Sequence, residues 1–406
     1  MSPRGASDRL GLTGWLLGLW LLGLSALSHA GVPSPPREPK GLWVVRTALL
    51  SPQSVDAVVD DAARAGFNAL FVQVRGRGDA FYESRLVVRS PLLANQPARF
   101  DPLARLLDRA RGRGLEVHAW INVLLSAHFG QPLPPGHVLR AHPEWVMVPK
   151  AAAQAGLVGR PADRLRLVSQ AARGDGDVEG YYLSPSSPAV GDHLEGVVRE
   201  LVRGYAVAGL HLDFIRYPGT DYDYSRSTLE SFRASDGGKD LLGGPARDPE
   251  GFDAFRRSTV TGLVRRLAAA GRSERQGLVV SAAVAPDEAH AVSQRFQDWP
   301  RWLDLGLLDA ICPMAYTPDR RLFRSQIESA VARTPAKVPV WAGIGAYRLN
   351  LQGTVERIRL AWEAGAAGVV VFSHESIGKG DLDRLRAQAF ARSESAPPRA
   401  GELGGR

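Results

Sequence analysis

The sequence predicts an α/β protein built as a (β/α)8 TIM-type barrel with extended loops after strands three and four. From Gly41 onward, a short apolar run, a loop, an amphipathic helical segment and a glycine follow one another repeatedly. This alternation predicts a parallel sheet, and runs that are nearly all apolar predict strands buried on both faces. Eight such units fit a barrel. An open doubly wound sheet is the alternative, but residues 47–51, the first loop, lack the glycine-rich phosphate loop of that fold.

Each element is predicted from its apolar pattern and from the residues that bound it. The expected strands are residues 42–46, 69–74, 116–121, 210–214, 278–283, 310–314, 338–344 and 368–372. The expected helices are residues 52–65, 102–111, 188–208, 252–270, 299–305, 322–331, 354–364 and 382–391. Ser51-Pro52 and Asp101-Pro102 place a proline in the first helical turn, and Gly66 ends the first helix. Residues 122–187 are too long for an ordinary connection, so they form a functional lid or an insertion. Another extended loop precedes residue 252.

The two ends of the chain differ from the rest in composition. Arg4 and Arg9 precede an apolar run, residues 12–24, and Ala30 stands at a typical cleavage site, which together predict a secretory signal peptide. An uncleaved membrane anchor is the alternative, but the run is short for a membrane span. We therefore expect export to the periplasm or the extracellular space, with no stable membrane span after cleavage. The expected divisions are a signal peptide (1–30), a Pro-rich linker (31–40), the catalytic barrel domain (41–392) and a disordered tail (393–406).

The chain is basic, with 50 Lys and Arg against 42 Asp and Glu and a net charge of +8. A basic exported protein can meet an anionic surface such as cell-wall polymer or membrane headgroups, although a solvated surface rich in Arg explains the same charge. Nucleic acid is not expected as a partner, because no basic cluster is interleaved with aromatic residues. The single cysteine, Cys312, excludes an internal disulfide and lies in an apolar strand, so we expect it to be buried rather than nucleophilic.

Residues 209–218 carry the most informative motif, Gly-Leu-His-Leu-Asp-Phe-Ile-Arg-Tyr-Pro. Asp213 lies near the C-terminal end of a short apolar strand, where an unpaired buried charge is costly. Parallel-barrel enzymes present catalytic groups at this end of their strands. The alternative is that Asp213 forms a salt bridge with Arg216 and only shapes a loop.

The loops at the C-terminal ends of barrel strands share one rim, and polar and aromatic residues of this chain gather there. The expected substrate-binding residues are Arg46, Gln73, Arg75, Asp79, Tyr82, Trp120, Asn122, Arg216, Tyr217, Tyr316, Trp341 and His374. Aromatic faces stack on sugar rings, and amide, carboxylate and guanidinium groups bind sugar hydroxyls. The rim therefore favours a carbohydrate ligand.

Glycoside cleavage needs two carboxyl groups, one to protonate the leaving oxygen and one to attack or to activate water. We expect Asp213 to be the nucleophile or base, since Arg216 nearby would keep it ionised. The acid partner is expected among Asp319, Asp287 and Glu375. Asp319 is favoured, because its apolar and aromatic neighbours would raise its pKa. Each of the three could instead be a loop residue in a salt bridge.

No metal and no cofactor is expected. The nine histidines include no pair at HExxH spacing. His211 shares a strand face with Asp213, but a hydrogen-bonded histidine of the barrel interior explains it better than a metal ligand. No Gly-x-Ser-x-Gly elbow is present, and the Gly-Arg-Gly segment at 76–78 is too short to indicate a phosphate loop.

Four phrases of the chain resemble the glycoside-hydrolase-like family 10 proteins of bacteria. They are residues 71–80, 117–122, 209–218 and 312–316, within a resemblance that runs in the same order over residues 41–391. The resemblance implies a TIM-type barrel, export to the cell envelope and action on a polysaccharide, with peptidoglycan glycan strands as one candidate. Many relatives carry a second acid directly after the residue that matches Asp213, where this chain has Phe214.

Two functional hypotheses follow. The first is an exported glycoside hydrolase that cleaves a bacterial envelope or cell-wall polysaccharide with paired carboxylates. The second is a non-catalytic barrel that binds glycan at the envelope, which the missing acid at Phe214 favours. A different hydrolase on the same rim, such as a deacetylase, would usually need a metal.

Overall fold

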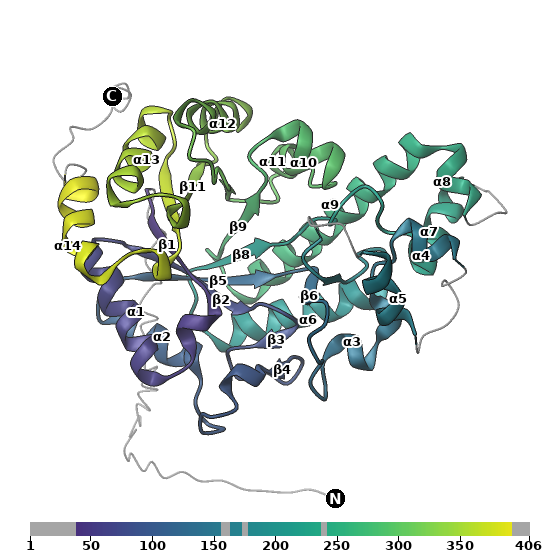
Figure 1. Cartoon of the computed structure of the whole chain (residues 1–406), viewed down its shortest axis with the longest axis horizontal. Coiled ribbons are helices and arrows are strands. Elements are labelled where there is room, and N and C mark those ends of the chain that lie inside the picture. Colours follow the sequence, from purple (N-terminus) through teal and green to yellow (C-terminus); the bar gives the residue numbers. More distant parts are fainter. Residues whose placement is uncertain (1–37, 156–162, 173–177, 237–241, 392–406) are drawn as a thin grey trace, which may run out of the picture. The chain divides into compact units, whose positions relative to one another are not determined.

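Eight parallel strands form a barrel at the centre of the fold (Figure 1). The computed structural model describes residues 38–155, 163–172, 178–236 and 242–391. The barrel strands are β1 (Lys40–Val44), β2 (Ala69–Arg75), β5 (Glu116–Asn122), β8 (Gly209–Asp213), β9 (Val279–Val284), β10 (Ala310–Pro313), β11 (Trp341–Gly345) and β12 (Gly368–Phe372). Each corresponds to one of the predicted strands, so the predicted barrel is confirmed.

The barrel closes almost completely. Its strands pair in parallel in the order β10-β9-β8-β5-β2-β1-β12-β11. β10 and β11, at the two ends of this order, meet through two isolated parallel bridges, Ile311 with Val340 and Met314 with Gly343. The C-terminal ends of all eight strands therefore share one rim, which an open doubly wound sheet would not provide.

Helices alternate with the strands and surround the barrel (Figure 1). They are α1 (Pro52–Ala65), α2 (Pro102–Arg111), α6 (Pro188–Gly204), α9 (Pro249–Glu274), α11 (Trp299–Asp304), α12 (Arg320–Arg333), α13 (Leu351–Glu363) and α14 (Leu382–Leu385), the last continuing in a wider helical turn to Phe390. Ser51 caps α1 and Gly66 ends it with a φ of 82°, as the sequence indicates. The sequence pattern does not reveal the short helix α10 (Glu288–Gln294).

The two extended loops predicted after strands three and four are present and carry elements of their own. The loop after β5 holds β6 (Leu125–Ala127), α3 (Val138–Ala141), α4 (Lys150–Gln154), α5 (Arg164–Ala171) and β7 (Tyr181–Tyr182). The loop after β8 holds α7 (Arg226–Asp236) and α8 (Gly243–Arg247), and a shorter loop after β2 holds β3 (Asp79–Ala80) and β4 (Val88–Arg89). The two long loops are joined by a backbone hydrogen bond from Tyr224 N to Val148 O at 2.7 Å. β6 and β7 pair antiparallel, which returns the chain to the end of β5.

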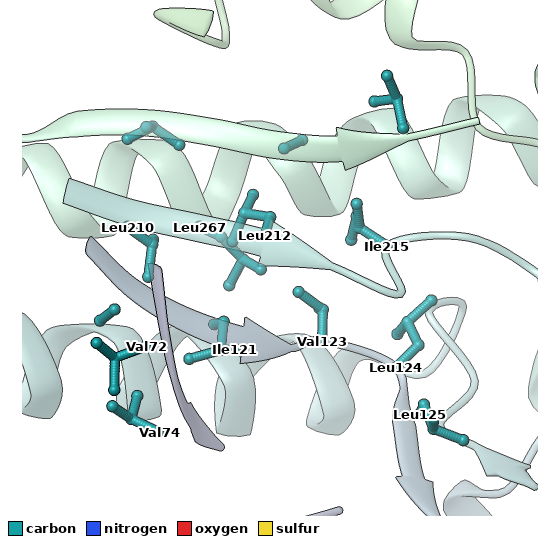
Figure 2. Close-up of a cluster of buried hydrophobic side chains, with 14 of the residues drawn as sticks. Val72, Val74, Ile121, Val123, Leu124, Leu125, Leu210, Leu212, Ile215 and Leu267 are labelled. Carbon is teal, nitrogen blue, oxygen red and sulfur yellow. The ribbon is translucent and has the colours of Figure 1, made fainter. Parts of the chain in front are cut away.

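Successive side chains along each strand point alternately outward and inward, which divides the core into two layers. Outward side chains, such as Val72 of β2, Ile121 of β5 and Leu212 of β8, lie in one large cluster with helix residues such as Leu267 of α9 (Figure 2). Inward side chains form a separate cluster: Trp43, Ala69, Phe71, Trp120, Val279, Ala310, Cys312, Trp341 and Val370. The barrel interior is therefore filled, as in other eight-stranded barrels, and the rim is the place for a site.

The predicted signal peptide (1–30), most of the linker (31–40) and the tail (393–406) lie outside the described residues. β1 begins at Lys40, the residue that ends the predicted linker. In the described part of the chain, no helix combines the length and the hydrophobicity needed to cross a bilayer.

Candidate active site

A cavity of about 580 Å³ lies at the C-terminal ends of the barrel strands. Side chains from several strand ends and from the loop after β5 converge on it. The residues predicted for the rim that line this cavity are Arg46, Gln73, Trp120, Asn122, Asp213, Arg216 and Tyr316.

Asp213 is the last residue of β8 and is only 8% exposed. Its Oδ2 accepts a hydrogen bond from Trp120 Nε1 at 3.1 Å, and its Oδ1 accepts one from the Phe214 backbone N–H at 2.7 Å. Burial raises the pKa of Asp213 to about 6, although both hydrogen bonds and the charge of Arg216 lower it. A carboxyl group with this pKa holds its proton in mildly acidic conditions, as a general acid must.

The backbone turns sharply directly after Asp213. Phe214 has a φ of 48°, in the left-handed region that non-glycine residues seldom adopt. Its ring lines the cavity, and the Arg216 guanidinium lies 5.0 Å from the centre of that ring. Strained backbone of this kind concentrates at functional sites.

Arg216 forms its ion pair with Glu179 and not with Asp213. Arg216 Nη2 lies 2.6 Å from Glu179 Oε1, and the Tyr182 hydroxyl donates to Oε2 at 2.5 Å. Burial raises the pKa of Glu179, but the charge of Arg216 and these hydrogen bonds outweigh it, so the pKa lies below its usual value. Arg216 acts on Asp213 in the expected direction, since its charge lowers that pKa, but burial outweighs the guanidinium and the pKa lies above its usual value.

Glu179 reaches the cavity from the loop after β5, just before β7. A Cβ on Gly180 would lie 2.0 Å from the Ala127 carbonyl oxygen, so only glycine permits this approach to β6. The His128 ring donates from Nδ1 to the Glu179 carbonyl oxygen at 2.5 Å. Sequence reasoning missed Glu179 because it lies in the stretch 122–187, which has no clear periodicity. The pattern that could have drawn attention to Glu179 is the glycine after it, followed by Tyr-Tyr-Leu, a short run typical of a strand.

The three acids expected as partners of Asp213 do not line the cavity. Asp319 and Asp287 are exposed and cap α12 and α10. Hydrogen bonds from the backbone of α12 hold the pKa of Asp319 below its usual value, in contrast to the rise that its neighbours suggest. Glu375 is exposed but touches the cavity wall, because the hydroxyl of Thr47, a lining residue, donates to its Oε1 at 3.2 Å.

Six of the predicted binding residues also lie away from this cavity. Four are buried against other parts of the chain: Arg75, Tyr82, Tyr217 and Trp341. His374 faces α1, where its Nε2 lies 3.1 Å from Asp61 Oδ2. Asp79 lines a second cavity beside the first.

Several lining residues were not expected from the sequence. They are Trp43, Val45, Thr47, Arg77, Leu125, His128, Glu179, Phe214, Ala283, Met314 and Phe372. Trp43 and Phe372, with ring centres 5.9 Å apart, belong to apolar strands and resemble core residues in the sequence. Their nearness to the rim follows only from the register of β1 with β12.

No metal-binding cluster of three or more His, Cys, Asp or Glu side chains occurs among the described residues. His211 lies in the barrel interior, as predicted, where Trp43 Nε1 donates to its Nε2 at 3.3 Å. Its Nδ1 lies 2.9 Å from Ser281 Oγ.

Solved structures share this fold. The PgaB (BpsB) glycoside hydrolase domain from Bordetella bronchiseptica superposes with a TM-score of 0.65 and 15% identity, over 87% of this chain and 99% of that one. The catalytic domain of a beta-amylase from Paenibacillus polymyxa gives a TM-score of 0.56 and 12% identity, over 89% of this chain and 100% of that one.

Sequence comparison points to a family. Glycosyl hydrolase DigH of Escherichia coli K12 is 24% identical over 378 residues, which cover 84% of this chain and 75% of that protein. Glycosyl hydrolase YngK of Bacillus subtilis 168 is 26% identical over 220 residues, covering 52% of this chain and 35% of that protein. The family model described as Glycosyl hydrolase-like 10 matches residues 38–357. Since that match spans well over half of the 406 residues, the chain belongs to the glycosyl hydrolase-like 10 family.

Proposed function

We propose that this protein is an exported glycoside hydrolase that cleaves a bacterial envelope or cell-wall polysaccharide. Family and fold support a glycosidase-like function. One observation carries the finer proposal: Asp213 and Glu179 line the same cavity, and their pKa values shift in opposite directions. Two carboxyl groups with separated pKa values are what glycoside hydrolysis requires. Export is inferred from the signal-peptide pattern of residues 1–30.

In the proposed reaction Asp213 gives its proton to the oxygen of the scissile glycosidic bond. Glu179, held ionised by Arg216, either attacks the anomeric carbon or takes a proton from the attacking water. The Trp120 N–H fixes the orientation of the Asp213 carboxyl group. The sequence predicts Asp213 as the nucleophile or base. In the proposed reaction it is the acid instead, because burial raises its pKa.

A chain of polar side chains next to this pair would bind sugar hydroxyls. Arg46 Nη1 donates to Gln73 Oε1 at 2.8 Å, and Gln73 Nε2 donates to Asn122 Oδ1 at 3.2 Å. Each side chain is thereby held in one orientation before substrate arrives, which lowers the cost of binding. Tyr316 and Phe372, with ring centres 5.6 Å apart, offer an apolar face for a sugar ring. Peptidoglycan glycan strands are one polymer that offers both sugar hydroxyls and sugar-ring faces to these side chains.

The test measures new reducing ends after incubation of the protein with purified peptidoglycan sacculi and with other envelope polysaccharides. Asp213→Asn and Glu179→Gln should each lower the rate at least about a hundredfold. Glu375→Gln is the matched control, since this exposed acid touches the cavity wall without lining it, and it should keep most of the activity. Loss of activity in Glu375→Gln with an active Glu179→Gln would move the second carboxylate to Glu375.

The non-catalytic alternative makes a different prediction for the same material. A barrel that only holds glycan would be pulled down with sacculi and release no reducing ends from any polymer. Cleavage that depends on Asp213 excludes this alternative.

A further inference from the structure

A second cavity, of about 320 Å³, adjoins the active-site cavity. The two cavities share Arg46, Arg77 and His128 as lining residues. Much of the remaining wall of the second cavity is apolar: Pro91, Leu92, Pro132, Leu133 and Pro134. A glycan longer than one sugar would pass from one cavity into the other across the two guanidinium groups.

The Gly-Arg-Gly segment directly after β2 carries Arg77 and lies against the side chain of Arg46. A Cβ on Gly76 would lie 2.7 Å from Arg46 Cδ and 2.8 Å from its Nη1, so glycine lets the Arg46 side chain rest on the backbone. Gly78 has a φ of 66°, and a Cβ there would lie 2.7 Å from His137 Nε2. Gly76 therefore lets the Arg46 side chain pack against the backbone, and Gly78 supplies the left-handed turn directly after Arg77.

The positive charge at the junction is only partly balanced. Arg46 donates to Gln73 and Arg77 donates to Gln131 Oε1 at 2.7 Å, so both hydrogen-bond acceptors are neutral amides. Neither guanidinium group forms an ion pair with any residue in the described part of the chain. Asp79 accepts a hydrogen bond from the Arg77 backbone N–H at 2.9 Å. Burial lowers the pKa of Arg77, and repulsion by Arg46 lowers it more than Asp79 raises it.

We propose that Arg46 and Arg77 form a subsite for a sugar that carries a carboxylate, next to the bond that is cleaved. The inference rests on the proposed glycoside hydrolase function and names the class of its substrate. Guanidinium groups match the geometry of a carboxylate, and hydrogen bonds between ionised partners are about twice as strong as neutral ones. Arg77 Nη1 donates to Gln131 and Nε is buried, which leaves Nη2, not buried and without a hydrogen-bond partner among the described residues, as the donor for such a contact.

Two kinds of sugar present this chemistry: a uronic acid, with the carboxylate on the ring, and a sugar with a carboxylate on an ether-linked substituent. The test uses one matched pair of probes for each. The first pair is tetragalacturonate and its carboxyl-reduced form. The second is the disaccharide N-acetylglucosaminyl–N-acetylmuramic acid and its methyl ester. Binding is measured by calorimetry at neutral pH on the full chain carrying Asp213→Asn, which prevents turnover.

We expect one anionic probe to bind about tenfold more tightly than its neutral partner. Arg77→Gln in the same background should reduce this ratio severalfold, since only Arg46 remains, while the affinity for the neutral probe stays the same. Arg321→Gln is the matched control, because Arg321 is an exposed residue of α12 that lines neither cavity. The pair that shows the preference identifies the kind of sugar.

Equal binding within both pairs, a preference that is undiminished in Arg77→Gln, or failure of both anionic probes to bind would each overturn the subsite. Cleavage is measured separately, as reducing ends released by the unsubstituted chain from sacculi and from other envelope polysaccharides, including uronic-acid polymers. A hydrolase without charge preference would refute the subsite alone. A charge preference without cleavage of any polymer would refute the hydrolase and leave a binding protein for acidic glycans.

Discussion

Arg216 and Glu179 form an ion pair, with 2.6 Å between Nη2 and Oε1, in the cavity that also holds Asp213. The positive charge of Arg216 lowers the pKa of both acids. At Asp213 burial outweighs this charge, whereas at Glu179 the charge and the hydrogen bonds outweigh burial. One arginine and one buried pocket thus shift the pKa values of two carboxyl groups of the same site in opposite directions, which suits an acid and a base that act together.

The first prediction concerns the pH dependence of kcat/KM for glycan cleavage. Activity requires a protonated Asp213, so it should fall as the pH rises through about 6. It also requires an ionised Glu179, whose pKa lies below its usual value, so it should fall again only at strongly acidic pH. We expect a bell-shaped profile with a mildly acidic optimum, measured by reducing-end release across the acidic and neutral range. A rate that rises as the pH passes through 6 would make Asp213 the base.

The second prediction is that Arg216→Gln moves both limbs of this profile to higher pH. The guanidinium lowers the pKa of Asp213 and of Glu179, so its removal should raise both. Because Glu179 also loses its partner, the free energy of unfolding should fall by about 1–3 kcal/mol at neutral pH. Arg203→Gln, which removes an exposed pair with Glu274 at 2.9 Å, should change neither limb. An unshifted profile in Arg216→Gln would contradict the proposed control of the two acids.

The third prediction concerns the stability of Asp213→Asn. The folded-state pKa of Asp213, about 6, lies above the value of about 3.9 for an unfolded chain, so the folded state binds this proton more tightly. This contribution to stability is full at strongly acidic pH and is lost as the pH rises through about 6. Asparagine cannot ionise and keeps an oxygen for the Trp120 N–H. The variant should therefore melt no lower than the parent at neutral pH, and its melting temperature should vary less with pH between about 4 and 6. A large fall in melting temperature, with activity lost in proportion, would indicate a structural role.

Local pattern was enough to predict the barrel and the place of Asp213 at the C-terminal end of a strand. Apolar runs that follow a glycine predict most of the strands. A carboxylate inside such a run, as at Asp213, stands out because burial of a charge is costly. The same reasoning could not find Glu179. Its position depends on the pairing of β6 with β7, between segments far apart in a stretch without periodicity.

Trp341 and Asp319 were predicted at the rim because the strand or helix beside each begins at a different residue from the one that the sequence predicts. The predicted seventh strand begins at residue 338, which puts Trp341 near the rim. β11 begins at Trp341, so the indole lies in the barrel interior instead. Asp319 was expected in a loop before a helix at residue 322, but α12 begins at Arg320 and Asp319 caps it. An acid directly before a helix is more often a cap than a catalytic group, and that pattern was readable in the sequence.

The last prediction concerns Tyr347, which follows β11 and is 54% exposed. Its ring centre lies 6.1 Å from that of Tyr316 and 5.9 Å from that of Phe372, two residues that line the cavity. Tyr347 therefore continues the aromatic wall outward, where the next sugar of a polymer can stack. Tyr347→Ala should raise KM for a polymeric substrate about fivefold, since such ring contacts contribute about 1 kcal/mol. The value of kcat should not change, because the contact is equal in the ground and transition states. Leu322→Ala, at a 49% exposed position of α12, is the control and should leave KM unchanged. An unaltered KM in Tyr347→Ala would show that the polymer does not cross this side of the rim, and a lower kcat would give the ring a part in the transition state.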